Sequence, residues 1–292
     1  MGFEACHPAV NLIFFAAVLY GSATFRHPVF LAIAYICAFA YSVKRRGRGA
    51  VVFNLCLLTL VAAFALYYSS YHHFGVTVLG KNFVDNNMTL ESLVYGLVIG
   101  LRFATVCMWL EAMFRVVSSD KVVYLFGKIS PLLSLFLTIL LRLIPRIGRE
   151  AGRINVAQKG IGRGSSQGNV FQRLINCLRI FSMLITWMIS ALALESDSMR
   201  SRGSLLKGRT AFSIYRFDNR DRAFVIALFA CITLTVMGVI LGASKMWYNP
   251  RIVWRPLDGI GIATAVGFLA LCMMPMGLEL WTEHRFRKAR EK

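Results

Sequence analysis

The chain has 292 residues, 57% of them hydrophobic, and a mean hydropathy of +0.59. A soluble domain cannot bury that much apolar surface, so the composition predicts a polytopic membrane protein. The formal net charge of +19 comes from 33 basic and 14 acidic residues. Cytoplasmic loops of membrane proteins collect Lys and Arg, which explains this charge better than nucleic-acid binding does. We therefore expect the lipid bilayer, and no nucleic acid, as a partner.

No pattern in the sequence indicates a catalytic, metal or nucleotide site. Most of the 7 cysteines lie within apolar runs, and none forms a Cys-x-x-Cys pair. The neighbours His72 and His73 could bind a metal on an outer loop, but adjacent side chains on a helix or strand point apart. The sequence has no phosphate-binding loop of the G-x-x-x-x-G-K-[ST] type and no Ser-His-Asp arrangement. We expect a protein that is not an enzyme and has no cofactor of its own.

Six apolar segments have about the length that a membrane span needs, roughly 20 residues. They are Pro8–Phe25, Pro28–Val43, Ala50–Ser70, Leu90–Phe114, Ala223–Ala243 and Gly259–Trp281. The basic cluster Lys44–Arg48 should be cytoplasmic, because Lys and Arg mark cytoplasmic loops. Counting spans from this cluster predicts that the N-terminus and the C-terminus are both cytoplasmic.

Residues 116–222 do not follow this alternation. The apolar helices expected at Asp120–Ile144 and Val170–Leu194 are each flanked on both sides by basic residues that should be cytoplasmic. A single span cannot join two cytoplasmic points, so we predict a cytoplasmic or interfacial helical module. The predicted organisation is an all-α integral membrane protein, with four spans in 1–115, the module in 116–222, and two spans plus a basic tail in 223–292.

Two features within the spans are informative. Arg102 lies near the middle of the fourth span, and a buried arginine in a membrane is a functional candidate. The alternative is that it pairs structurally with a backbone carbonyl or with a carboxylate elsewhere in the bundle. The pairs Gly96 with Gly100 and Gly238 with Gly242 have the spacing that permits close approach of helices.

Two basic segments follow apolar runs in the central module, at Ala157–Gly164 and at Glu195–Gly203. In the second segment, Arg202 stands in the last helical turn and Gly203 can end the helix in a left-handed cap. This local interpretation is sufficient for an ordinary helix end. The alternative is that an exposed arginine between small residues docks into an acidic groove of a partner, where a guanidinium bonds bidentately.

The sequence resembles the transmembrane T component of energy-coupling factor (ECF) transporters, a branch of the ABC importers. The resemblance covers most of the chain. It is carried by His7-Pro8, His27-Pro28, Thr89–Leu93 with Gly96 and Arg102, and Leu141–Pro145, and most specifically by the two basic segments. In that family two Ala-Arg-Gly-type motifs end two cytoplasmic coupling helices. Each arginine docks in a groove of one of two ATPase subunits, and the T component passes their motion to a substrate-binding S component.

The second basic segment matches the family's motif, with Arg202 at the position of the family's arginine and Ser201 before it. In the first motif Ile161 stands where the arginine would be, and Arg163 or Lys159 is the candidate replacement. The resemblance implies that the ATPase-docking residues are Arg202, Gly203, Ser201, Arg200, Arg163, Gly164 and Lys159. It implies an apolar platform for the S component at Leu132, Phe136, Leu140, Leu184 and Met188.

The implied function is that of a non-catalytic coupling subunit in the cell membrane. ATP would be bound by the two partner ATPases, and a vitamin or a metal ion such as cobalt or nickel would be taken up through the S component. The alternative is a stand-alone secondary transporter or channel with its own substrate path. A membrane-embedded enzyme and a protein that binds anionic lipid through its basic module are further alternatives.

Overall fold

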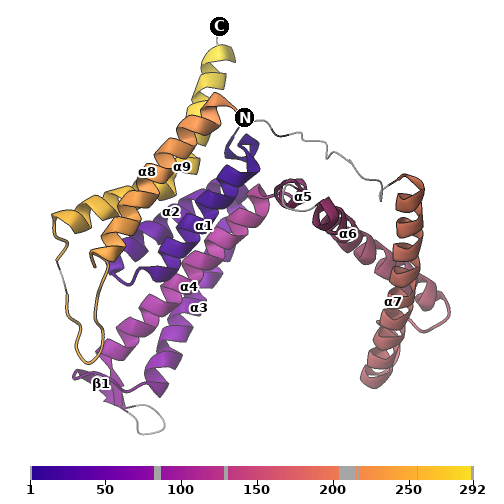
Figure 1. Cartoon of the computed structure of the whole chain (residues 1–292). Helices are drawn as coiled ribbons and strands as arrows, with labels where there is room; N and C mark the ends of the chain where they lie inside the picture. The colour runs from indigo at the N-terminus through magenta and orange to yellow at the C-terminus, as the bar shows by residue number, and fades with distance from the viewer. Residues whose placement is uncertain are drawn as a thin grey trace. The chain divides into compact units, whose positions relative to one another are not determined.

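The computed structural model describes residues 2–81, 87–127, 131–203, 215, 217–254 and 256–290 (Figure 1). Contacts divide the chain into two compact units, Met1–Ser118 with Tyr215–Lys292, and Ser119–Ile214. The first unit contains the elements η1 (Phe3–Ala5), α1 (Pro8–Thr24), α2 (Pro28–Arg46), α3 (Arg48–Tyr71), β1 (Val78–Lys81), β2 (Asn87–Thr89), α4 (Leu90–Val116), α8 (Asn219–Ile240) and α9 (Gly259–Arg290). The second contains α5 (Ser119–Gly127), α6 (Pro131–Gly160) and α7 (Val170–Ser201).

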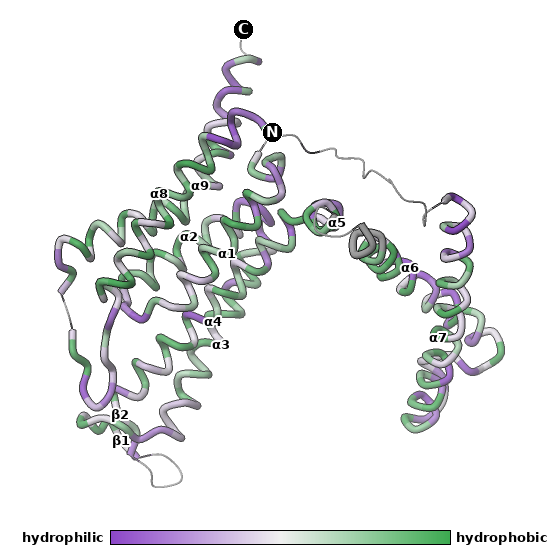
Figure 2. Tube along the Cα trace, in the orientation of Figure 1, coloured by the Kyte–Doolittle hydropathy of each residue, from purple (hydrophilic) through white to green (hydrophobic). Residues whose placement is uncertain are grey.

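The expectation of an all-helical membrane protein is confirmed. In the described part of the chain, six helices are long and apolar enough to cross a bilayer, namely α2, α3, α4, α7, α8 and α9. Figure 2 shows hydrophobic residues along much of α8 and hydrophilic residues in the C-terminal turns of α9. The set differs from the predicted spans, because α1 has 17 residues and α7 has 32. The cytoplasmic or interfacial position of 116–222 concerns the membrane itself and stays a prediction.

The first two helices begin at the two His-Pro pairs. Pro8 and Pro28 occupy the first helical turn, where a proline's missing N–H is no loss. The Nδ1 atoms of His7 and His27 accept hydrogen bonds from the N–H groups two residues later, at 3.3 Å in both cases. A side-chain acceptor in this position satisfies one of the open N–H groups of the first turn. In each His-Pro pair the histidine therefore caps the helix and the proline is its first residue.

Helix α4 is the centre of the first unit and packs against α1, α2 and α3. Its Trp109 is fully buried, with ring centroids at 6.0 Å from Phe14, 6.5 Å from Phe15 and 5.9 Å from Tyr41. The α1 rings meet it edge-on, which is a favourable arrangement for aromatic pairs. The core of this unit is built from one face of α4 together with buried side chains of α1, α2, α8 and α9.

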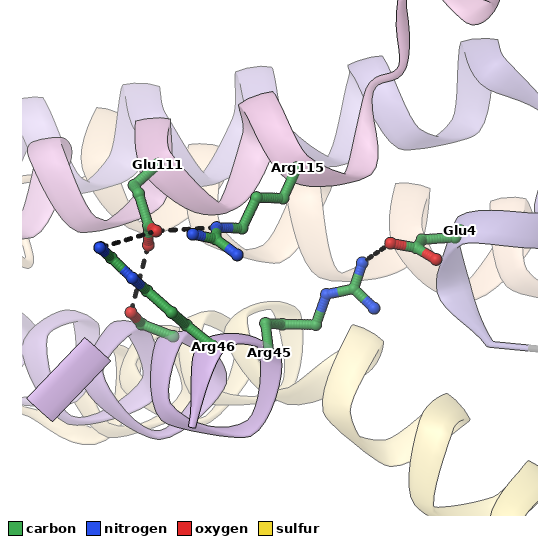
Figure 3. Close-up of polar contacts among 6 residues, drawn as sticks. Glu4, Arg45, Arg46, Glu111 and Arg115 are labelled. Carbon is green, nitrogen blue, oxygen red and sulfur yellow. Dashed lines mark hydrogen bonds and ion pairs between the residues drawn. The ribbon is translucent and has the colours of Figure 1, made fainter. Parts of the chain in front are cut away.

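The basic C-terminal end of α2 forms ion pairs with acidic side chains from other elements (Figure 3). Glu111 of α4 pairs with Arg46 at 3.4 Å and with Arg115 at 2.8 Å. Arg45 pairs with Glu4 of η1. The cluster that the sequence predicts to be cytoplasmic is therefore largely neutralised within the unit.

The glycine pairs have different roles. A Cβ atom on Gly96 would lie 3.0 Å from the Cα atom of Ala65, so α3 and α4 approach closely there. Gly100 also faces α3, and Gly238 faces Thr264 of α9. These three close approaches confirm the sequence interpretation. The interpretation of Gly242 is wrong: its φ of +79° ends α8 in a left-handed turn.

Replacing Gly96 with Ala should destabilise the protein, because backbone atoms of α3 must move to admit the new methyl group. We expect a loss of about 1–3 kcal/mol, typical of overpacking. The same substitution at Gly277 of α9 meets open space, and there it should be neutral or stabilise by up to about 1 kcal/mol. Thermal unfolding in detergent, followed by circular dichroism, compares the two variants, and equal effects would contradict the close α3–α4 approach.

Candidate functional site

The second unit presents two helix ends that are built alike. Each of α6 and α7 is followed by a glycine with positive φ, Gly162 at +75° and Gly203 at +74°. The Gly162 N–H donates to the carbonyl of Lys159 at 3.1 Å, and the Gly203 N–H donates to the carbonyl of Arg200 at 3.0 Å. These bonds satisfy carbonyls that would otherwise be open at a helix C-terminus. The two predicted docking segments thus share one backbone design.

The two turning glycines allow the two segments to be aligned residue by residue without using the Ala-Arg-Gly-type motif. Lys159 and Arg200 each stand three residues before the turning glycine, and both side chains are exposed. Ile161 and Arg202 each stand one residue before it, and Ile161 is 65% exposed. Arg163 comes only after the turn, where its N–H closes a second capping bond. The structural counterpart of Arg202 is therefore Ile161, and the counterpart of Arg200 is Lys159.

The small residues of the two segments are placed differently. Ser201 is exposed and donates a hydrogen bond from its hydroxyl to the carbonyl of Ser198 at 2.8 Å. Gly164 is buried, and a Cβ atom there would lie 2.2 Å from Cγ of Lys159. The absence of a side chain at Gly164 therefore makes room for the Lys159 stem beside the turn.

Polar side chains hold the connection between α6 and α7 in one conformation. The buried Asn176 donates from Nδ2 to the carbonyl of Gly164 at 3.2 Å and to that of Gln167 at 3.4 Å. Asn155 accepts from the N–H of Ser165 at 3.0 Å. Buried backbone groups need such partners, since leaving them unpaired is costly. The orientation of the first helix end is thus fixed by residues of both helices.

The start of α7 is fixed as well. Asn169 caps the helix, with its side chain accepting from the N–H of Val170 at 2.9 Å. The Gln172 side chain accepts in return from the N–H of Asn169 at 3.2 Å, which completes a capping box.

Glu195 forms ion pairs within the second unit. Its carboxylate lies 3.9 Å from the guanidinium groups of both Arg142 and Arg146 of α6. Arg146 also lies over the ring of Trp187, with 5.4 Å from Cζ to the ring centroid. Because these contacts join α6 to α7 beyond the turn, the two helix ends belong to one packed hairpin.

The implied platform residues divide into two groups. Phe136 and Leu140 of α6 are exposed, Leu184 and Met188 of α7 are half-buried, and the side chain of Leu132 lies outside the described part of the chain. Sequence reasoning missed a longer exposed stripe on α7. Its members recur at spacings of three and four and are Leu174, Leu178, Phe181, Ile185, Ile189 and Leu192. That spacing is visible in the sequence and is typical of one helix face.

Replacing Asn176 with Ala should loosen the α6–α7 turn, because two backbone carbonyls lose their donor. We expect a local cost of about 1–3 kcal/mol, and therefore amide hydrogen exchange in residues 161–169 that is faster by roughly tenfold or more. The matched control is Ser166→Ala, which removes an exposed side chain of the same turn. Unchanged exchange in the Asn176 variant would show that the turn does not depend on this side chain.

The described residues contain no group of three or more His, Cys, Asp or Glu side chains that could hold a metal ion. Comparison with protein-family models and with curated proteins finds no match for this chain. What the two helix ends share is a left-handed glycine with an exposed cation three residues before it.

Proposed function

We propose that the chain is the membrane coupling subunit, or T component, of an ECF-type importer. It lies in the cell membrane with both termini in the cytoplasm. Two ATPase subunits bind the ends of α6 and α7, and ATP is bound and hydrolysed by those partners. A separate S component binds the micronutrient, a vitamin or a metal ion, and is moved by the coupling subunit.

The matching design of the two helix ends is the observation that carries this proposal. Each end places a cation three residues before a left-handed glycine, and the hairpin holds the ends in fixed orientation. Arg200 and Arg202 are exposed, so their guanidinium groups are available to carboxylates of a partner. An ordinary helix cap explains one such end, whereas two ends of one backbone design favour a paired docking function.

The exposed apolar stripe of α7 supports the proposed S-component platform. Six aliphatic or aromatic side chains on one helix face form a patch of the kind that binds another protein or lipid. Phe136 and Leu140 of α6 extend the apolar surface that the second unit offers. A partner buried in the membrane would cover such a stripe with its own apolar helices.

A stand-alone transporter requires a solute path, and the first unit has a small recess between three of its helices. It has a volume of about 60 Å³ and is lined by apolar residues of α1, α8 and α9, including Ala17, Ile232 and Phe268. Small-molecule sites are typically about 300–1,000 Å³. This recess is too small and too apolar to hold a polar nutrient.

The variant Arg202→Glu should lose its ATPase partners. Reversing the charge places a carboxylate against an acidic groove, and such a juxtaposition costs several kcal/mol, so we expect at least a tenfold loss of co-purified ATPase. The measurement is affinity purification of the tagged full chain from native membranes in mild detergent, with partners quantified by mass spectrometry. Arg179→Glu is the matched control, since it makes the same change on an exposed residue of the same helix. Full co-purification with Arg202→Glu, or no ATPase with the unaltered chain, would refute the proposal.

The alignment of the two ends makes a second prediction. Lys159→Glu should weaken ATPase binding more than Arg163→Glu does, because Lys159 occupies the position of Arg200 whereas Arg163 lies beyond the turn. The same purification, performed on both variants, measures this order. A larger loss in the Arg163 variant would assign the first docking cation to the residue after the turn.

A further inference from the structure

The last turns of α9 form an exposed, basic extension of a helix that is long and apolar enough to cross a membrane. Glu279 is the last buried residue of this helix, and every residue from Glu283 to Arg290 is exposed. Residues 284–290, which we call the α9 tail, contain no acidic residue, and Figure 2 shows mostly hydrophilic residues there. The Lys and Arg residues of the tail are Arg285, Arg287, Lys288 and Arg290.

The acidic residues that precede the tail are already paired with α2. Glu283 lies 3.2 Å from Nζ of Lys44, and Glu279 lies 3.9 Å from the same atom and 3.5 Å from Arg45. In the part of the chain that the structure describes, none of the tail's Lys and Arg residues forms an ion pair. The tail therefore keeps its positive charge for an external partner.

The exposed side of α9 changes from apolar to aromatic to basic along the helix. Trp281 is 54% exposed, and Arg285 and Lys288 follow it by four and seven residues, which places them on its face. At 3.6 residues per turn, Glu279 and Glu283 lie about 160° around the helix from Trp281. This face is thus turned away from α2. The exposed apolar residues that precede it on α9 are Ile262, Val266, Leu269, Met273 and Leu280.

This order and spacing match the layers of a bilayer leaflet. Tryptophan is enriched at the boundary between hydrocarbon and headgroups. Arg285 and Lys288 lie about 6 Å and about 10 Å beyond Trp281 along the helix axis. The headgroup region extends roughly 5–8 Å beyond the hydrocarbon on each side, and long basic side chains reach over such distances. The two cations therefore fall at the level of the lipid phosphate groups.

The contact between Trp281 and Arg285 joins the aromatic and the basic parts of this face. Cζ of Arg285 lies 4.9 Å from the centroid of the Trp281 ring. A guanidinium over an indole ring is attracted by its π electrons. The contact holds Arg285 on the outer face and leaves N–H groups of the guanidinium open to a second partner.

We propose that the α9 tail binds the headgroups of anionic phospholipids, with Arg285 and Lys288 as the cations that contact the phosphate groups. Clusters of Lys and Arg immediately beyond a membrane helix attract anionic lipids, and a guanidinium can donate two hydrogen bonds to one phosphate. An acidic protein would meet the same charge, but the apolar side that leads to Trp281 favours lipid. The site lies in the first unit and does not depend on the proposed coupling function.

Brominated lipids test this proposal, because bromine atoms quench the fluorescence of a nearby tryptophan. The full chain is placed in nanodiscs of phosphatidylcholine and phosphatidylglycerol, with one or the other lipid brominated. The contribution of Trp281 is the difference between the unaltered chain and Trp281→Phe. A cation near an anionic surface contributes roughly a fivefold preference. We expect phosphatidylglycerol to be preferred around Trp281 by at least about that factor, and Arg285→Gln with Lys288→Gln to reduce the preference by a similar factor.

The matched control is Lys245→Gln with Arg251→Gln, which removes one exposed lysine and one exposed arginine from the α8–α9 connection, before α9 begins. It should keep the preference, whereas sodium chloride should reduce it because salt screens exposed charges. Equal quenching by the two lipids, which a tail that binds an acidic protein would give, would overturn the proposal. So would an unchanged preference in the tail variant or an equal loss in the control. If Trp281→Phe does not fold, the ratio of the two lipids that co-purify with the tail variant and the control decides in the same way.

Discussion

The ionic junction at the basic end of α2 is the constraint on which the first unit depends. Three consecutive cations end this helix, and acidic groups reach them from three other elements. Glu279 of α9 is the most buried of these acids, with its side chain 8% exposed, and lies 3.5 Å from Arg45 and 3.9 Å from Lys44. A buried carboxylate that loses its partners is strongly destabilising. The junction thus fixes the mutual positions of η1, α2, α4 and α9.

This junction reduces the share of the net positive charge that is available to partners. A cluster that appears in the sequence as free positive charge is mostly neutralised inside the unit, so it offers little to lipids, nucleic acids or proteins. Among the described residues, exposed cations without an ion pair include Lys159, Arg200 and Arg202 at the helix ends of the second unit. The net charge of +19 therefore does not attract anions equally at every surface of the protein. It is divided between internal pairing and exposed cations such as those at the helix ends of the second unit.

Local rules predicted the features that depend on neighbouring residues. The starts of two helices at Pro8 and Pro28 and the glycine cap after Arg202 follow from the chemistry of a helix end, whereas the capping by His7 and His27 was seen only in the structure. The faces of α7 were not predictable in this way. Glu195 pairs with arginines of α6 and Met188 is half-buried, while Phe181 and Ile189 are exposed, and only the packing of the hairpin decides between these positions. Gly242 shows the same limit, since its spacing suits helix packing but its backbone ends α8.

The two helix ends share their backbone but not their chemistry. Where the second end presents Arg202, the first presents Ile161, an exposed aliphatic side chain beside Lys159. A groove that binds a planar guanidinium with carboxylates would leave those carboxylates unpaired against an isoleucine. Under the proposed function, the two ATPase grooves must therefore differ, with one that is acidic and one that is partly apolar and accepts a lysine. Such a difference requires two non-identical ATPase subunits, and it gives the coupling subunit one fixed orientation between them.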